Sequence, residues 1–269
     1  MTLPFSEVNS TKIVFGKMAN PVLSEKVFQK ESAISQSSTM TVGGTAIKSL
    51  VLVLMVLAGA SYTWKVFNEA LNPASVTPWM WGGAIGGFIT AIVISFKPNL
   101  AQYLAPIYAV LQGLFLGAIS AMFNSAFEMT APGIVMNATL LTIITAMVML
   151  LVYRTRIIKV DGKFARIMVI AVGAIAFYYF VSIILSLFGV NLTMLHDGGP
   201  LSIGISIVIV LVAAFSLLMD FNFIEKASAA GAPKYMEWYG AFGLMVTIIW
   251  LYLEILKLLA KFANLTVLD

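Results

Sequence analysis

Seven apolar stretches, separated by short polar segments, account for most of the sequence. They lie at 47–64, 80–96, 104–123, 134–153, 167–188, 201–221 and 239–262. Most reach the ~20 residues that a helix needs to cross the hydrocarbon core of a bilayer, and Trp or Tyr borders the shortest ones. Helix breakers such as Pro132-Gly133 stand in the connections. We therefore expect an all-α, polytopic membrane protein built as a seven-transmembrane-helix bundle.

Three parts follow from this pattern. Residues 1–46 are polar and show no apolar period, so we expect a mostly disordered cytoplasmic tail. No apolar segment follows Met1, which argues against a cleavable signal peptide. Residues 47–262 form the transmembrane domain, and 263–269 form a short exterior tail.

Composition restricts the class of protein further. The chain is 60% hydrophobic and only 10% charged, with a mean hydropathy of +0.96, so a soluble fold could not cover its apolar surface. It contains no Cys and a single His, His196, which argues against a Cys-based or zinc site. Nothing resembles a Ser–His or Cys–His pair, so we expect no enzyme and no cofactor. The net charge of +4 implies no nucleic-acid partner, because the basic residues are distributed by membrane side.

The distribution of Lys and Arg predicts the orientation. With the N-terminus in the cytoplasm, every Lys and Arg except Lys65, Lys257 and Lys261 falls on the cytoplasmic side. The C-terminus is then exterior, because the number of spans is odd. The expected location is a bacterial cytoplasmic (inner) membrane, with the lipid bilayer as the first partner.

Glycines recur at a four-residue spacing in the second and third stretches. The pairs are Gly82 with Gly86, Gly83 with Gly87, and Gly113 with Gly117. Each pair shares one helix face and permits close approach of another helix. Tight packing within one bundle is the main expectation, and dimerisation is the alternative.

Carboxylates lie within the last two stretches, Asp220 in the sixth and Glu254 in the seventh. An Asp at the centre of a lipid-facing helix costs roughly 2.5–3.5 kcal/mol, so such residues usually face a bundle interior or a wet cavity. Two carboxylates in one low-dielectric site hold a proton between them or attract a hard cation such as Ca²⁺. Asp220 and Glu254 are therefore the candidate proton-sensing and Ca²⁺-binding residues.

Each carboxylate also has a purely structural interpretation. Asp220 lies near a basic loop and could pair with a lysine, and Glu254 has Lys257 at i+3. A straight seventh helix from Tyr239 places Glu254 about 22 Å in, too far from Asp220 for contact. Only a bend, for example at Gly240, would bring the two together.

Other polar residues are weaker candidates. Gln112, Asn222 and Tyr252 could line a cavity, although Gln112 is as readily an interhelical hydrogen-bonding residue and Tyr252 a packing aromatic. His196 stands in a predicted exterior loop and is expected to be solvated.

The residues around the two carboxylates resemble a known family. Asp220, followed by Asn222 and Ile224, is similar to the sixth-helix pattern of the Bax inhibitor-1 (transmembrane Bax inhibitor motif) family, and 251–254, Leu-Tyr-Leu-Glu, is similar to its seventh-helix Leu-Tyr-Leu-Asp. The segments 112–120, 132–135 and 231–239 resemble a YccA-type bacterial branch. The resemblance spans about residues 40–262.

This resemblance implies a pH-sensitive Ca²⁺ leak in which Asp220 and Glu254 form a buried proton-sensing pair. Glu254 replaces the usual Asp. A basic residue at the end of the second helix pairs with the carboxylates in a closed state of the family, and Lys97 is its counterpart here. The alternatives are a membrane protein that modulates a membrane protease or a stress pathway, and a coupled ion transporter.

Overall fold

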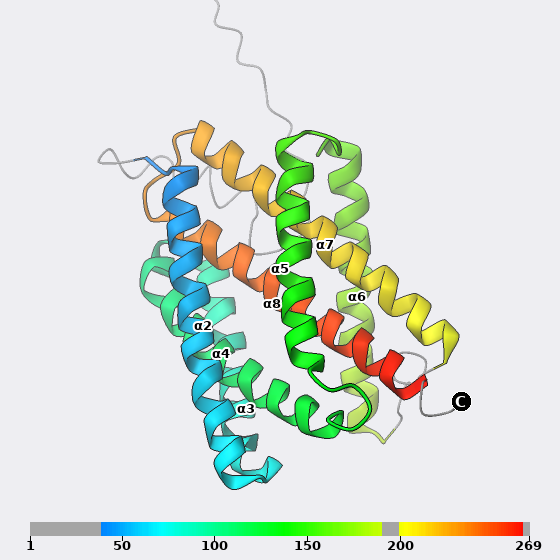
Figure 1. The fold of residues 1–269 in the computed structure, drawn as a ribbon. Helices are drawn as coiled ribbons and strands as arrows, with labels where there is room; N and C mark the ends of the chain where they lie inside the picture. Colours follow the sequence, from blue (N-terminus) through cyan, green and yellow to red (C-terminus); the bar gives the residue numbers. More distant parts are fainter. Residues whose placement is uncertain (1–38, 190–198, 266–269) are drawn as a thin grey trace, which may run out of the picture.

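The computed structural model describes residues 39–189 and 199–265, and these residues form a helical bundle (Figure 1). Its elements are α2 (Val42–Ala70), α3 (Pro73–Phe96), the 3-10 turn η1 (Pro98–Leu100), α4 (Ala101–Ala126), α5 (Ile134–Arg154), α6 (Gly162–Leu187), α7 (Pro200–Ala229) and α8 (Met236–Leu265). Within the described part of the chain, seven helical segments are long and apolar enough to cross a membrane. The predicted fold class is confirmed.

Six of the predicted spans lie inside one of these helices, and the fifth, 167–188, extends one residue beyond the end of α6 at Leu187. α2 begins at Val42, five residues before the predicted 47, because the side chain of Thr41 caps it and accepts a hydrogen bond from the Gly44 amide. Most of the predicted N-terminal tail, the loop with His196 and the last four residues of the C-terminal tail lie outside the described residues.

The helix α8 is the centre of the bundle and contacts α2, α4, α5 and α7. In Figure 1, α2, α3 and α4 lie on one side of it, and α5 and α6 lie on the other. Tyr108 and Phe242 pack in the core of the first side, while Leu217 and Leu251 pack in the core of the second. α6 is the most exposed span. The two candidate carboxylates therefore belong to helices that pack inside the bundle.

Glycines set the close packing around α4. A Cβ atom on Gly113 would stand 2.3 Å from the Val56 carbonyl oxygen, and one on Gly83 would stand 2.4 Å from the Leu111 carbonyl oxygen. Gly82, by contrast, has nothing within 4 Å of its Cβ position. The predicted tight packing within one bundle is confirmed for the glycines that face α2 and α4.

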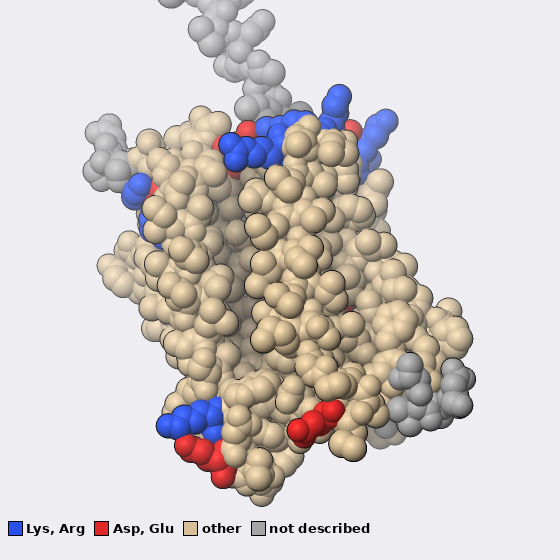
Figure 2. All heavy atoms as spheres, viewed as in Figure 1, with Lys and Arg blue, Asp and Glu red and all other residues tan. Residues whose placement is uncertain are grey.

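Nearly all the charged side chains in the view of Figure 2 lie toward the two ends of the molecule. Lys and Arg gather at the end that carries the α5–α6 connection, and the belt between the ends is almost entirely uncharged on this face. An uncharged belt of helices is what a bilayer core requires, because unpaired charges there are costly. The chain is a multi-pass membrane protein.

Candidate functional site

Asp220 is a fully buried carboxylate in the middle of the bundle, with an exposed fraction of 0%. It lies on α7, nine residues before the helix ends at Ala229, which is ~14 Å along the helix axis. Ile224 stands one turn further on the same face of α7 and approaches Gly240 of α8. Asp220 therefore lies on the face of α7 that packs toward α8.

Glu254 is also buried, with 3% of its surface exposed, and it is the centre of a hydrogen-bonded cluster. Its Oε1 accepts from Lys257 Nζ at 2.6 Å, from the Tyr179 hydroxyl at 2.9 Å and from Trp250 Nε1 at 3.1 Å. Lys257 Nζ also donates to the Tyr179 hydroxyl at 2.9 Å and lies 4.7 Å from the centre of its ring. The predicted ion pair with Lys257 is thus present, and two aromatic side chains support it.

The two candidate carboxylates do not meet. Glu254 lines a cavity of about 250 Å³ together with Ser206 and Ile209 of α7. Asp220 is 11 residues beyond Ile209, or ~16 Å along α7. α8 runs without interruption from Met236 to Leu265, so no break at Gly240 shortens this separation.

The cavity beside Glu254 also holds a second buried ammonium. Lys261 has an exposed fraction of 9%, and its Nζ donates to Ser206 Oγ at 2.6 Å and to the Ser202 carbonyl at 3.3 Å. Two ammonium groups and one carboxylate therefore face the same space. In this structure Glu254 is balanced by local cations rather than by a second acid.

The remaining predicted residues lie apart from this cluster. Lys97 is the exposed C-terminal cap of α3 and makes no ion pair within the described part of the chain. Gln112 is half-buried against Gly87, where a Cβ atom would stand 2.4 Å from its Nε2. Asn222 is buried on α7, and the Tyr252 hydroxyl lies 2.6 Å from Ser120 Oγ on the wall of an apolar cavity of about 330 Å³.

Glu237 is a buried carboxylate that the sequence did not point to. Its exposed fraction is 0%, and Thr41 donates to its Oε1 at 2.9 Å from both the amide and the hydroxyl. Lys234 Nζ lies 2.7 Å from the same oxygen, and Lys48 forms an ion pair with the other. The i,i+3 spacing of Lys234 and Glu237 was visible in the sequence, whereas Lys48 and Thr41 are about 190 residues away.

Glu225 forms a further ionic cluster at the same end. Arg156 Nη2 donates to both of its carboxylate oxygens, at 2.7 and 2.9 Å, and the Tyr153 hydroxyl also donates to it. Among the described residues, no group of three or more His, Cys, Asp or Glu side chains could hold a metal ion. A cation bound at any of these carboxylates would therefore be coordinated by that single carboxylate together with backbone or hydroxyl oxygens.

Comparison with known protein families identified a match that covers most of the chain. A family model described as Bax inhibitor 1 like matches residues 20–264, which include all seven spans and both candidate carboxylates. No curated protein and no solved structure matches the chain.

Proposed function

Because the chain belongs to the Bax inhibitor 1 like family, we propose that it is a pH-sensitive cation leak, with Ca²⁺ as the permeant ion. Protonation of Asp220 and Glu254 closes the path in this proposal. Both side chains lie on helices that pack inside the bundle, where an ionised carboxylate attracts a cation more strongly than it does in water.

The burial of Asp220 is the observation that carries the proposal. A carboxylate with 0% exposure in a membrane-spanning helix is energetically costly, and residues of this kind mark ion pathways in membrane proteins. Its charge depends on pH, so its attraction for a cation depends on pH as well. The carboxylate is neutral at low pH and ionised at high pH, and the leak should increase as pH rises through its apparent pKa.

Glu254 acts as a second cation-binding position, separate from Asp220. Ile209, which lines the cavity beside Glu254, lies ~16 Å from Asp220 along α7, so the two carboxylates are too far apart to share one proton. The ammonium of Lys257 forms an ion pair with the Glu254 oxygen to which a cation would bind. Passage therefore requires the ammonium of Lys257 to swing away, and Lys257 replaces Lys97 as the closed-state counter-charge.

A flux assay tests the proposal. The protein is reconstituted into vesicles with a trapped Ca²⁺ indicator, and uptake is measured between pH 5.5 and 8. We expect Asp220→Asn to reduce uptake at pH 8 to the level of the wild type at acidic pH, and Glu254→Gln to reduce it partly.

Glu128→Gln is the matched control, because Glu128 is an exposed carboxylate in the α4–α5 connection. Size-exclusion profiles verify that each variant is folded. Uptake and pH dependence that are unchanged in both Asp220→Asn and Glu254→Gln would exclude these residues from the path.

The proposal includes an orientation in a bacterial cytoplasmic membrane. The basic end in Figure 2 is placed in the cytoplasm together with the N-terminus, in keeping with the excess of Lys and Arg in cytoplasmic loops. Glu225 and Glu237 then lie near the cytoplasmic surface, and Glu254 with Lys257 lies nearer the exterior.

A further inference from the structure

A long groove separates α2 from α5. Near the basic end, a cavity of about 600 Å³ is lined by Thr45 and Ser49 of α2, by Leu150 and Arg154 of α5, and by parts of α7 and α8. The apolar cavity of about 330 Å³ continues along the same two helices, from Val53 to Trp64 on α2 and from Ile143 to Val135 on α5. The hollow between the two sides of the molecule is visible in Figure 2. We refer to both cavities together as the α2–α5 groove.

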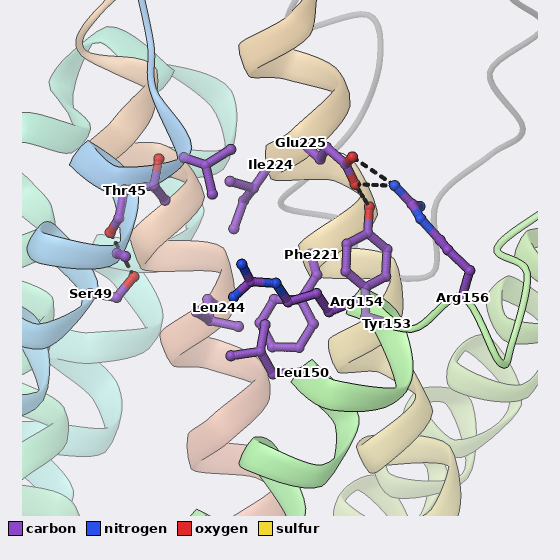
Figure 3. A pocket seen from close by; sticks show the side chains of 12 residues that line it. Thr45, Ser49, Leu150, Tyr153, Arg154, Arg156, Phe221, Ile224, Glu225 and Leu244 are labelled. Carbon is purple, nitrogen blue, oxygen red and sulfur yellow. Dashed lines mark hydrogen bonds and ion pairs between the residues drawn. The ribbon is translucent and has the colours of Figure 1, made fainter.

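Two arginines stand at the polar end of this groove, and they differ in their partners. Arg156 is held by Glu225 through two hydrogen bonds. Arg154 makes no ion pair or hydrogen bond from its guanidinium to any described residue, and Figure 3 shows this guanidinium extending into the cavity between Ile224 and Leu244. The groove therefore combines a positive charge that pairs with none of the described residues with an apolar interior.

The dimensions suit one acyl chain. Within the groove, the part of α2 from Ser49 to Ala60 spans 11 residues, or ~16 Å, which is about half the thickness of a bilayer core, and the lining continues to Trp64. The lining over this length is apolar except for hydroxyl groups, such as that of Ser120, that are already hydrogen-bonded. A guanidinium pairs well with phosphate oxygens, because its donors form a planar fork.

We propose that the α2–α5 groove is a binding site for an anionic phospholipid. The phosphate lies on Arg154, and one acyl chain runs between α2 and α5. The apolar part of the groove lies within the uncharged belt, so a lipid reaches it sideways from the leaflet on the basic side. The site does not depend on the proposed leak, and it gives Arg154 a role beyond its contribution to orientation.

Native mass spectrometry of the intact chain tests the site, with phosphatidylglycerol as the probe and phosphatidylcholine as the competitor. We expect the wild type to retain one phosphatidylglycerol molecule in preference to phosphatidylcholine. Arg154→Gln should lower the retained fraction about tenfold, since a charge-assisted hydrogen bond is lost. Arg154→Lys should keep part of the binding as a point charge.

Arg166→Gln is the matched control, because Arg166 is an exposed arginine at the same end that does not line the groove. It should retain the lipid as the wild type does. Ala46→Phe tests the steric part of the site, since Ala46 is an exposed α2 residue at the mouth of the groove and its enlargement should exclude the lipid without changing charge.

Three outcomes would overturn the proposal. Equal retention by the wild type and Arg154→Gln would show that Arg154 does not hold the phosphate. An equal loss of retained lipid in Arg166→Gln would show that the binding depends on general surface charge and not on Arg154 in particular. The wild type could also form a dimer that retains no lipid. If Ala46→Phe converts this dimer to a monomer, the groove is an interface with a second copy of the chain.

Discussion

At the residue scale, the buried carboxylates of Glu237 and Glu254 are both paired with nearby lysines. Lys257 approaches Glu254 to 2.6 Å and is itself partly exposed, whereas Glu237 is enclosed by Thr41 and two lysines. Breaking a buried pair costs more than forming it contributes, because the remaining charge stays desolvated. Glu237 therefore suits a fixed structural tie, and Glu254 suits a charge that can be released.

The ion pair between Lys257 and Glu254 leads to a prediction for a Lys257 variant. Lys257→Gln should raise Ca²⁺ uptake several-fold at neutral pH, because the ammonium no longer occupies Oε1 of Glu254. Lys97→Gln should leave uptake unchanged, since Lys97 is exposed at the end of α3. The vesicle assay measures both variants. A rise in Lys97→Gln without one in Lys257→Gln would restore Lys97 as the counter-charge.

At the element scale, the bundle is assembled by close helix contacts on one side and by polar ties at the basic end. Gly113 and Gly117 allow α4 to approach the backbone of α2 at Val56 and Ala60. The start of α2 is attached to the α7–α8 turn by a hydrogen bond of 2.7 Å from the Met40 amide to the Ala232 carbonyl, and to α8 by Glu237. α2 and α8 are thus held at fixed positions along the groove.

The glycine contacts predict a contrast in stability. Gly113→Val should lower stability by about 1–3 kcal/mol or more, because its Cβ would overlap the Val56 carbonyl oxygen. Gly82→Val should have little effect, since nothing lies within 4 Å of its Cβ position. Thermal unfolding in detergent compares the two. Equal melting temperatures for both variants would contradict the packing described for α4.

At the scale of the whole molecule, the charge distribution predicts the orientation. The chain contains no cysteine, so single cysteines can be introduced without background. In intact cells, Glu128→Cys should react with a membrane-impermeant maleimide, and Lys163→Cys should react only after the cells are opened. Glu128 is exposed in the α4–α5 connection and Lys163 is exposed in the first turn of α6, at the opposite end of the bundle. The reverse labelling pattern would invert the proposed orientation.

The seven helices and their approximate ends were predictable from the sequence. Hydropathy and length act locally, and a bilayer leaves backbone groups few alternatives to a helix. The i,i+3 pair of Lys257 with Glu254 was also visible, because residues three apart share a helix face. Helix starts were less accurate, since the cap formed by Thr41 precedes the apolar stretch.

The sequence by itself determined the membrane class, the helices and the burial expected of Asp220 and Glu254, because each follows from the cost of charge in an apolar medium. Only the tertiary structure decided which groups meet. It separates Asp220 from Glu254 by the offset of α7 against α8, and it brings Lys48 to Glu237 across 189 residues. Such contacts depend on how helices pack side by side, and no local pattern in the chain encodes that arrangement.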